Sequence, residues 1–385
     1  MSLVLDEHRE YLSDRNRLHA YASAIEELVK PGAVVVDLGC GTGIMGLLAC
    51  RAGASRIYCI EQTSLIGLTR EIFSANGYAD RLTSIKALST HVSLPEKVDV
   101  VVADQIGRFG FDAGILEFFN DARERFLKPE GILLPARIDL MVAPVEHEEQ
   151  WREIEFWNQC PAGFDFQSAR KIAANTGYPV KLQSQQLLAT PAMIASLATD
   201  ECPALIHGAE ASMNVQRAGM LHGIGGWFCA QLSPRVTMSN GPLDAQRIGR
   251  RNVFFPIDKP VAVDKGDRVR VSMTIQPRDT MVTWRVEVCD QRSPPDGGEV
   301  VRARFVHSTF KGMLLCEEDL ARERPGFVPS LTPRGEARGS ILELCDGRNS
   351  LAEIEQEVYR RHPQLFTSQG QAAAFVAEVV TRYTQ

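Results

Sequence analysis

The fold is decided by the stretch Val34-Val35-Val36-Asp37-Leu38-Gly39-Cys40-Gly41-Thr42-Gly43. Its apolar start predicts a buried strand, and the glycines that follow predict a tight turn with bare backbone. The next segment, Ile44 to Ala52, has helical character, so the free N–H groups at the start of a helix would face the same turn. The stretch therefore predicts a strand, a ligand-binding loop and a helix.

The spacing of the glycines distinguishes between two classes of cofactor. Dinucleotide-binding loops have the pattern G-x-G-x-x-G, because a pyrophosphate must approach the backbone closely. Here the pattern is G-x-G-x-G preceded by Asp37, which suits a cofactor with no phosphate and a positively charged amino-acid end. Glu61 ends the next apolar run, where such folds place the acid that binds ribose hydroxyls. These features predict S-adenosylmethionine as the cofactor, and the alternative is a turn that binds nothing.

The composition indicates a globular protein with more than one domain. The chain has 385 residues, 44% of them hydrophobic, and its net charge of -6 argues against a nucleic-acid partner. Its nine cysteines form no C-x-x-C pair and no cluster with histidines, so we expect no metal site and a reducing compartment. The start of the chain lacks an apolar targeting segment, and no stretch has the length of a membrane span. We therefore expect a cytoplasmic protein with no membrane partner.

Apolar runs alternate with helical segments from Ala33 to Leu134. Together with two helices expected within Leu5 to Val29, this alternation predicts an α/β, Rossmann-like domain with a parallel sheet, over residues 1–144. Ligands in such sheets bind at the carboxyl ends of the strands, so the residues that end neighbouring strands should converge on one rim. These residues are Asp37, Glu61, Ala87 and Asp104.

Two further domains are predicted after this one. Residues 145–316 begin with an aromatic-rich segment and continue into alternating β-branched runs, which predict an antiparallel sandwich or barrel. The runs are Val269–Ile275, Thr283–Val288 and Val300–Val306. Residues 317–385 contain helical segments that begin at Thr332-Pro333 and at the capping box of Ser350 and Glu353. They predict a small helical or winged-helix unit that serves as an interaction module.

From about His8 to about Val306 the sequence resembles the protein arginine methyltransferases. The matching residues are His8, Leu12, Asp14, Arg17, Tyr21, Val36–Ile44, Arg51–Ala54, Glu61, Leu94–Asp99, Leu127–Pro129, Trp157-Asn158 and Gly163–Asp165. The resemblance implies an S-adenosylmethionine domain, a β-barrel, and a helical dimerisation arm between about Trp151 and Val180. It therefore implies a homodimer.

The resemblance also assigns roles to residues on the cofactor side. His8 and Arg17 would close over the methionine end of the cofactor, and Asp37 would line it. Without the resemblance, the segment Leu5 to Val29 favours a different interpretation of Arg17, as a charge on the solvent-exposed face of a helix. Glu61 would hold the ribose, and Thr90 falls where the family has a glutamate near the adenine. The predicted cofactor-binding residues are His8, Arg17, Asp37, Gly39, Gly41, Gly43, Glu61, Ala87, Leu88 and Thr90.

The substrate side departs from the family at two places. A family loop with two glutamates, which grips a guanidinium, matches residues 104–113, where Asp104 replaces the first glutamate and Ala113 the second. The family's Thr-His-Trp element is replaced by Arg247-Ile248-Gly249. We predict that Asp104 and the neighbouring Asp112 orient or deprotonate the methyl acceptor. Arginine is not assumed to be that acceptor.

The last segment resembles the small peptide-recognition domain of pyrroloquinoline quinone biosynthesis. The likeness lies in Leu342–Arg348 and Leu351–Ile354, and it implies that a leader peptide binds by strand addition beside a helix. We therefore predict an S-adenosylmethionine-dependent methyltransferase that modifies a side chain of a peptide or protein, such as a ribosomally made precursor peptide. The alternatives are a catalytically altered cofactor-binding scaffold and a small-molecule methyltransferase.

Overall fold

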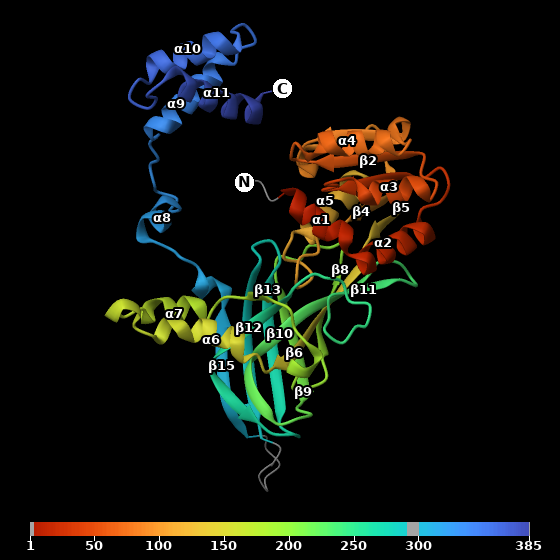
Figure 1. Ribbon diagram of the computed structural model, residues 1–385, viewed down its shortest axis with the longest axis vertical. Coiled ribbons are helices and arrows are strands. Elements are labelled where there is room, and N and C mark those ends of the chain that lie inside the picture. The colour runs from red at the N-terminus through yellow and green to blue at the C-terminus, as the bar shows by residue number, and fades with distance from the viewer. Residues whose placement is uncertain (1–3, 291–299, 385) are drawn as a thin grey trace. The chain divides into compact units, whose positions relative to one another are not determined.

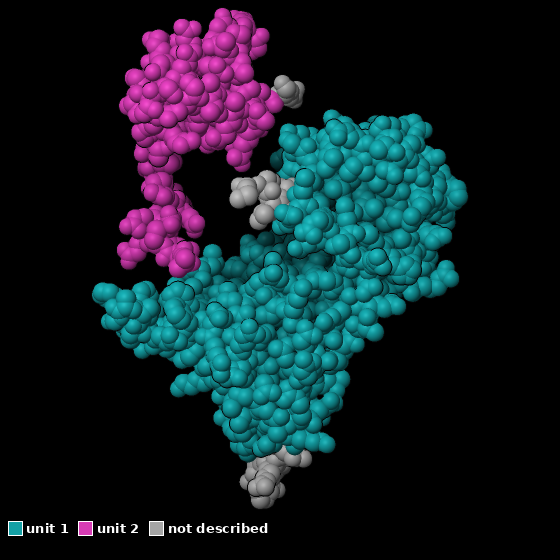
Figure 2. Space-filling view, in the orientation of Figure 1, with its two compact units in different colours: residues 1–313 teal, residues 314–385 magenta. Residues whose placement is uncertain are grey.

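The structure is a computed structural model that describes residues 4–290 and 300–384. The chain divides into two compact units, Met1–Met313 and Leu314–Gln385 (Figure 2). Over the described residues, no helix combines the length and the apolar character that a membrane crossing requires.

The first half of the larger unit is built on a five-stranded parallel sheet with the order β3-β2-β1-β4-β5. Its strands are β1 (Val34–Leu38), β2 (Arg56–Glu61), β3 (Leu82–Lys86), β4 (Val98–Ala103) and β5 (Leu127–Leu134). Val35, Val36 and Leu38 of β1 are at most 1% exposed, which explains the unbroken apolar run in the sequence. The parallel pairing confirms the predicted Rossmann-like domain.

Helices flank this sheet (Figure 1). They are α1 (Val4–Ser13), α2 (Arg15–Leu28), α3 (Ile44–Arg51), α4 (Leu65–Ala75) and α5 (Ile115–Arg125). The two helices predicted ahead of β1 are α1 and α2, and Asp14 separates them. Its side chain accepts a hydrogen bond from the backbone N–H of Arg17 at 3.1 Å and so caps α2.

Residues 137–308, which we call the barrel region, form two antiparallel sheets and a helical arm. One sheet has the order β7-β12-β10-β6-β8 with β11 paired to β10, and the other has the order β15-β14-β13-β9. The strands are β6 (Arg137–Val145), β7 (Tyr178–Val180), β8 (Ala192–Ala198), β9 (Ile206–Asn214), β10 (Gly219–Gln231), β11 (Thr237–Ser239), β12 (Asn252–Val263), β13 (Arg268–Gln276), β14 (Met281–Cys289) and β15 (Val301–Ser308). The last three confirm the predicted alternating runs, and β6 places the start of this region ahead of residue 145.

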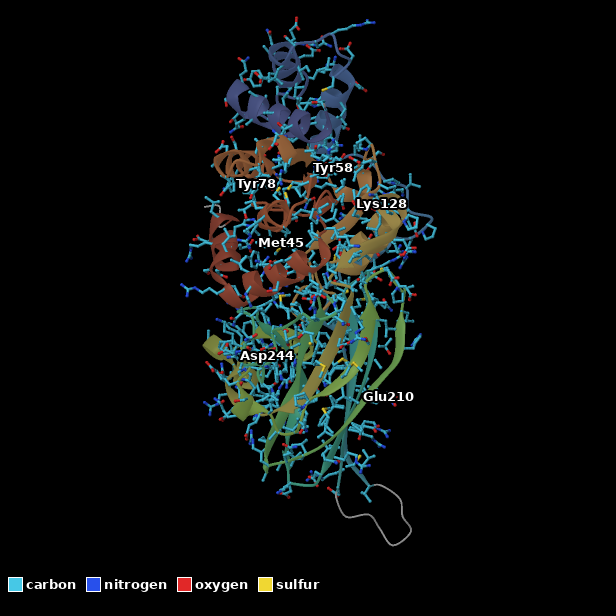
Figure 3. All side chains as sticks on the ribbon, turned by 90° about the vertical axis from the view of Figure 1, so that its right-hand side faces the viewer. Met45, Tyr58, Tyr78, Lys128, Glu210 and Asp244 are labelled. Carbon is cyan, nitrogen blue, oxygen red and sulfur yellow. The ribbon has the colours of Figure 1, made fainter. Side chains whose placement is uncertain are left out.

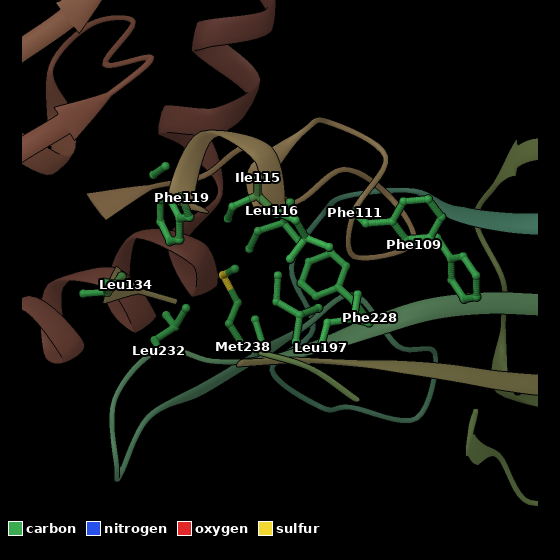
Figure 4. Packing of buried hydrophobic residues seen from close by; sticks show 14 of the residues in the cluster. Phe109, Phe111, Ile115, Leu116, Phe119, Leu134, Leu197, Phe228, Leu232 and Met238 are labelled. Carbon is green, nitrogen blue, oxygen red and sulfur yellow. The ribbon is translucent and has the colours of Figure 1, made fainter. Parts of the chain in front are cut away.

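The Rossmann-like half and the barrel region share one hydrophobic core. Phe119 of α5 belongs to the same buried cluster as Phe228 of β10 and Met238 of β11 (Figure 4). Figure 3 shows the side chains of both regions, with Met45 labelled in the Rossmann-like half and Glu210 labelled on β9. This shared packing joins the Rossmann-like half and the barrel region into one compact unit.

The predicted dimerisation arm is a helical excursion from the barrel region (Figure 1). It contains α6 (Glu148–Glu155), the single turns Phe156–Asn158 and Pro161–Gly163, and α7 (Gln167–Ala173). Phe156, Phe164 and Phe166 are 42%, 69% and 40% exposed. The arm therefore presents aromatic surface to the solvent.

The smaller unit is helical. Its helices are α8 (Glu317–Arg322), α9 (Pro333–Leu344), α10 (Leu351–Arg361) and α11 (Gln369–Tyr383), and α9 to α11 enclose a core of their own. Thr332 caps α9, and Ser350 and Glu353 form the predicted capping box at α10. Residues 314–384 contain helices and no strand. Of the two predicted forms, a helical unit or a winged-helix unit, the structure contains the helical one.

Candidate active site

Several strand ends meet at one edge of the parallel sheet. β1 pairs in parallel with β2 and β4, and β2 pairs in parallel with β3, so residues after these strands lie on the same rim. The order along the rim is Ala87, Glu61, the glycine loop after Asp37, and Asp104. The predicted convergence of these strand ends is confirmed.

The glycine loop is in close contact with side chains from two other segments. Gly39 and Gly41 have φ values of +61° and +55°, a conformation that favours glycine. A Cβ atom at Gly41 would lie 2.4 Å from Cε1 of His8, and one at Gly39 would lie 2.1 Å from Nε2 of Gln105. The loop therefore has a bare backbone that only glycine allows, with α1 and the segment after β4 beside it.

Asp37 lies beneath this loop. It is 2% exposed, and its Oδ2 accepts a hydrogen bond from the backbone N–H of Gly46 in α3 at 2.9 Å. Burial raises the pKa of Asp37 to about 7, against the opposing effects of the Gly46 hydrogen bond and the charge of Arg17. Asp37 thus joins β1 to the start of α3.

Glu61 lies next to the loop at the end of β2. Its Oε2 accepts a hydrogen bond from the N–H of Gly41 at 3.3 Å, so the carboxylate faces the glycines. Beyond it on the rim, the N–H of Ala87 donates to the carbonyl oxygen of Glu61 at 3.2 Å. Ala87, Leu88 and Thr90 are half-buried and lead away from β3.

Asp104 is held between two guanidinium groups. Its Oδ2 accepts hydrogen bonds from Nε of Arg17 at 2.6 Å and Nη2 of Arg250 at 2.8 Å, and its Oδ1 accepts one from the Tyr21 hydroxyl at 3.0 Å. Burial by itself raises the pKa of Asp104, but Arg250 and Arg17 outweigh burial and hold the pKa below its ordinary value. Asp104 is therefore an ionised group with little tendency to accept a proton.

Asp112 uses one carboxylate oxygen to shape its own loop. Its Oδ1 accepts hydrogen bonds from the backbone N–H groups of Arg108 at 2.7 Å and Phe109 at 2.8 Å. A Cβ atom at Gly107 would lie 2.2 Å from the same oxygen. Asp112 thus lines the same cleft as Asp104, but it is placed there by a tight turn.

The segment after residue 246 docks on the N-terminal helices. The N–H of Gly249 donates to Oδ2 of Asp14 at 2.7 Å, and the carbonyl oxygen of Arg247 accepts from Nδ2 of Asn16 at 3.0 Å. These hydrogen bonds bring Arg250 to Asp104, although the two residues lie 146 positions apart in the chain.

A cleft of about 930 Å³ opens beside Asp104. It is lined by α1, the start of α2, the loop after β4, and residues 248–251, and its volume suits a ligand site. On its wall the Tyr11 ring lies 5.3 Å from the Arg17 guanidinium and 5.8 Å from that of Arg250. Within residues 4–290 and 300–384, no group of His, Cys, Asp or Glu residues could hold a metal ion.

Sequence reasoning missed three residues of this site, which are Tyr11, Gln105 and Arg250. The only available signal for Arg250 was its position directly after Arg247-Ile248-Gly249, the segment already noted as unusual. The structure places the predicted residue Arg17 against Asp104, and its charge also lowers the pKa of Asp37.

Two family models match the chain. The arginine methyltransferase oligomerization subdomain matches residues 136–288, and the ribosomal protein L11 methyltransferase matches residues 21–138. The chain is 27% identical over 287 residues to protein arginine N-methyltransferase 6 of Xenopus laevis, covering 71% of this chain and 84% of that protein. It is 28% identical over 292 residues to protein arginine N-methyltransferase 1 of Schizosaccharomyces pombe, covering 71% and 82%. The chain is a methyltransferase related to the protein arginine methyltransferases.

Solved structures share the fold of this methyltransferase. The Trypanosoma brucei PRMT1 enzyme–prozyme heterotetrameric complex with AdoHcy has a TM-score of 0.67 at 20% identity, covering 78% of this chain and 97% of that one. Arabidopsis thaliana protein arginine methyltransferase 10 also has a TM-score of 0.67, at 21% identity, covering 79% and 98%. These likenesses confirm the predicted fold class.

The pKa of Asp37 predicts how the stability of the methyltransferase depends on pH. The pKa of Asp37 is about 7 in the folded protein, and its ordinary value is 3.8. The contribution of this group to the free energy of unfolding is therefore complete at a pH below the ordinary pKa, and it is lost as the pH rises toward the pKa of the folded protein. The loss is about 1.4 kcal/mol per pH unit. The free energy of unfolding of Asp37→Asn, relative to the unchanged protein, should therefore rise between about pH 5 and about pH 7, as measured by denaturant titration.

Asp99→Asn is the matched control. Burial raises the pKa of Asp99, but Lys128 and the N–H of Val34 outweigh burial and lower it. Asp99 therefore titrates below this pH window. The free energy of unfolding of Asp99→Asn should vary with pH in parallel with that of the unchanged protein. Parallel curves for Asp37→Asn would contradict the assigned titration.

Proposed function

We propose that this methyltransferase, whose cofactor is S-adenosylmethionine, transfers a methyl group to a side chain of a peptide or protein. A ribosomally made precursor peptide is the proposed substrate class. The supporting observation is that the bare glycine loop and Glu61 lie on the same rim as Asp104, beside an open cleft. When bound, S-adenosylmethionine supplies an electrophilic methyl group on a sulfonium.

The residues on the rim fit this cofactor. The backbone at Gly39 and Gly41 lies so close to the side chains of Gln105 and His8 that a Cβ atom there would overlap them, and the Glu61 carboxylate can accept hydrogen bonds from both ribose hydroxyls. We propose that His8, Arg17 and Asp37 surround the methionine end, and that Ala87, Leu88 and Thr90 border the adenine.

Asp104 and Asp112 are the proposed catalytic residues, as groups that orient the acceptor side. Asp104 fixes the positions of Arg17 and Arg250 by hydrogen bonds, and Asp112 fixes the turn of the loop. We also propose that the guanidinium-gripping loop of the family is degraded here, because Ala113 offers no carboxylate at the second position. Positioning of the acceptor would then provide most of the rate acceleration.

Replacing Glu61 with Gln should weaken S-adenosylmethionine binding. The change removes the charge from the acceptor of the ribose hydroxyls, and a charge-assisted hydrogen bond contributes about 1.5–3 kcal/mol. We expect the dissociation constant to rise by about 10- to 100-fold, as measured by calorimetry. Glu71→Gln, on the exposed face of α4, is the control that should bind normally. Equal affinity of both variants would contradict the role of Glu61.

The smaller unit is proposed to dock the peptide substrate. Helices α9 to α11 have a core of their own, which contains Ile341, Val358 and Phe375, so the unit does not depend on the larger one for its packing. The likeness to peptide-recognition domains supports this proposal, while the proposed cofactor-binding residues, from His8 to Thr90, all belong to the larger unit.

Deleting the residues after Arg324 should therefore weaken peptide methylation and leave S-adenosylmethionine binding unchanged. Methylation is measured by mass spectrometry of candidate precursor peptides, and cofactor binding by calorimetry on the same preparations. Loss of cofactor binding on deletion, or methylation at the full rate, would contradict peptide docking by this unit.

A homodimer formed through the arm is proposed from two observations. A family model named for oligomerization spans the arm, and Phe156, Phe164 and Phe166 expose aromatic surface there. Exposed aromatic side chains of this kind typically become buried in protein interfaces.

Phe164→Glu should convert the dimer to a monomer, because it places a charge in the covered apolar surface. Size-exclusion chromatography with light scattering measures the change. Met193→Glu, at a side chain that is 53% exposed on β8 outside the arm, should leave the dimer intact. A dimer that survives Phe164→Glu would show that the arm is not the interface.

A further inference from the structure

Arg250 is paired with Asp104, the carboxylate that a cationic methyl acceptor would need as its partner. Its Nη2 lies 2.8 Å from Oδ2 of Asp104, and its Nη1 donates to the carbonyl oxygen of Gly107 at 3.4 Å. The side chain of Arg250 is 13% exposed and that of Asp104 is 12% exposed. One buried carboxylate is thus shared by two guanidiniums, those of Arg17 and Arg250, and the cluster has an excess of one positive charge.

Two other carboxylates that line the cleft already accept hydrogen bonds from the backbone. Asp14 accepts hydrogen bonds from backbone N–H groups of Arg17 and Gly249, and Asp112 accepts two from its own loop. Glu7 and Glu10 also line the cleft but lie exposed on α1. A guanidinium entering the cleft would find free carboxylates on α1 but not at Asp104, whose oxygens already bind Arg17, Arg250 and Tyr21.

Basic side chains also line the cleft. Arg108, Lys181 and Arg251 are among its lining residues and are exposed. Over the part of the chain that the structure describes, none of their side chains has an ion-pair partner within 4.0 Å. Together with Arg250 they form a surface that attracts anions.

The chemistry of proton transfer leads to the same conclusion. A guanidinium must lose a proton in order to be methylated, so it requires a base. Asp104 is ion-paired with two arginines and so has little tendency to accept a proton. An acceptor that enters the cleft already deprotonated needs no base.

We propose that the acceptor is a carboxylate of an acidic peptide, and that Arg250 selects it by neutralising Asp104 and presenting its own guanidinium to the incoming anion. This inference rests on the proposed function and names its substrate class. In the step, a lone pair of the carboxylate oxygen forms the new O–C bond as the C–S bond to the sulfonium breaks. The bonding electrons go to sulfur, the products are a methyl ester and a neutral thioether, and no proton moves.

The test compares two matched peptides, one of alternating glycine and glutamate and one of alternating glycine and arginine. Calorimetry with the full chain and S-adenosylhomocysteine measures the binding of each peptide without turnover. Incubation with methyl-labelled S-adenosylmethionine then measures transfer. Methyl esters release volatile labelled methanol in alkali, whereas methylated nitrogen keeps its label. We expect the glutamate peptide to bind more tightly and to carry alkali-labile label.

Arg250→Gln should lower binding and labelling of the glutamate peptide by about tenfold, because a charge-assisted hydrogen bond is lost. Arg235→Gln is the control, because it removes a guanidinium that is 82% exposed outside the cleft. It should change neither the binding nor the labelling of the glutamate peptide. In Arg250→Gln, Asp104 still pairs with Arg17, so no carboxylate is left without a partner. The double variant Arg250→Gln with Asp104→Asn restores the net positive charge of the cluster but lacks the Arg250 guanidinium, so it should also bind the glutamate peptide less tightly than the unchanged protein.

Preference for the arginine peptide, alkali-stable label, or an unchanged preference in both Arg250 variants would overturn the carboxylate assignment. Binding of neither peptide while S-adenosylhomocysteine still binds would also overturn it. Failure of the unchanged protein to bind S-adenosylmethionine or S-adenosylhomocysteine would instead overturn the proposed function. The two failures are therefore distinguishable.

Discussion

Asp104 joins three parts of the chain. The carboxylate follows β4 of the parallel sheet, Arg17 comes from α2, and Arg250 comes from the segment that precedes β12. Removing one partner from a buried ion pair typically costs about 3–5 kcal/mol, because it leaves an uncompensated charge. The cluster therefore constrains how the N-terminal helices, the sheet and the barrel region can be arranged. The cleft exists where these parts meet.

This constraint acts together with the shared hydrophobic core. Side chains of α5 and of the barrel strands pack in one cluster (Figure 4), so the edge of the sheet and the segment at residues 247–251 keep a fixed separation. Asp14 and Gly249 add a hydrogen bond across the same boundary. The glycine loop with Glu61 and the segment at residues 247–251 are thus held by different elements.

The local parts of the fold could be predicted from the sequence and the long-range parts could not. The glycine loop, Glu61 and the capping box at Ser350 depend on neighbours a few residues apart, so a pattern in the chain reveals them. Strand β10 was missed because both of its faces are buried and glycines interrupt its apolar run. The partnership of Arg250 with Asp104 was missed because it forms only when the barrel region folds against α1 and α2. The sequence predicted that Asp104 acts on the methyl acceptor. The net charge at this position depends also on Arg17 and Arg250, which the sequence did not place beside Asp104.

In the proposed site, Asp104 is paired with Arg250 and Arg17 and does not bind the substrate. The most direct measurement is a crystal structure of the full chain with S-adenosylhomocysteine bound at the glycine loop. We expect Nη2 of Arg250 to remain within hydrogen-bonding distance of Oδ2 of Asp104 in that complex, with the guanidinium facing the cleft. A complex in which Arg250 points to solvent and leaves Asp104 open to the cleft would contradict it.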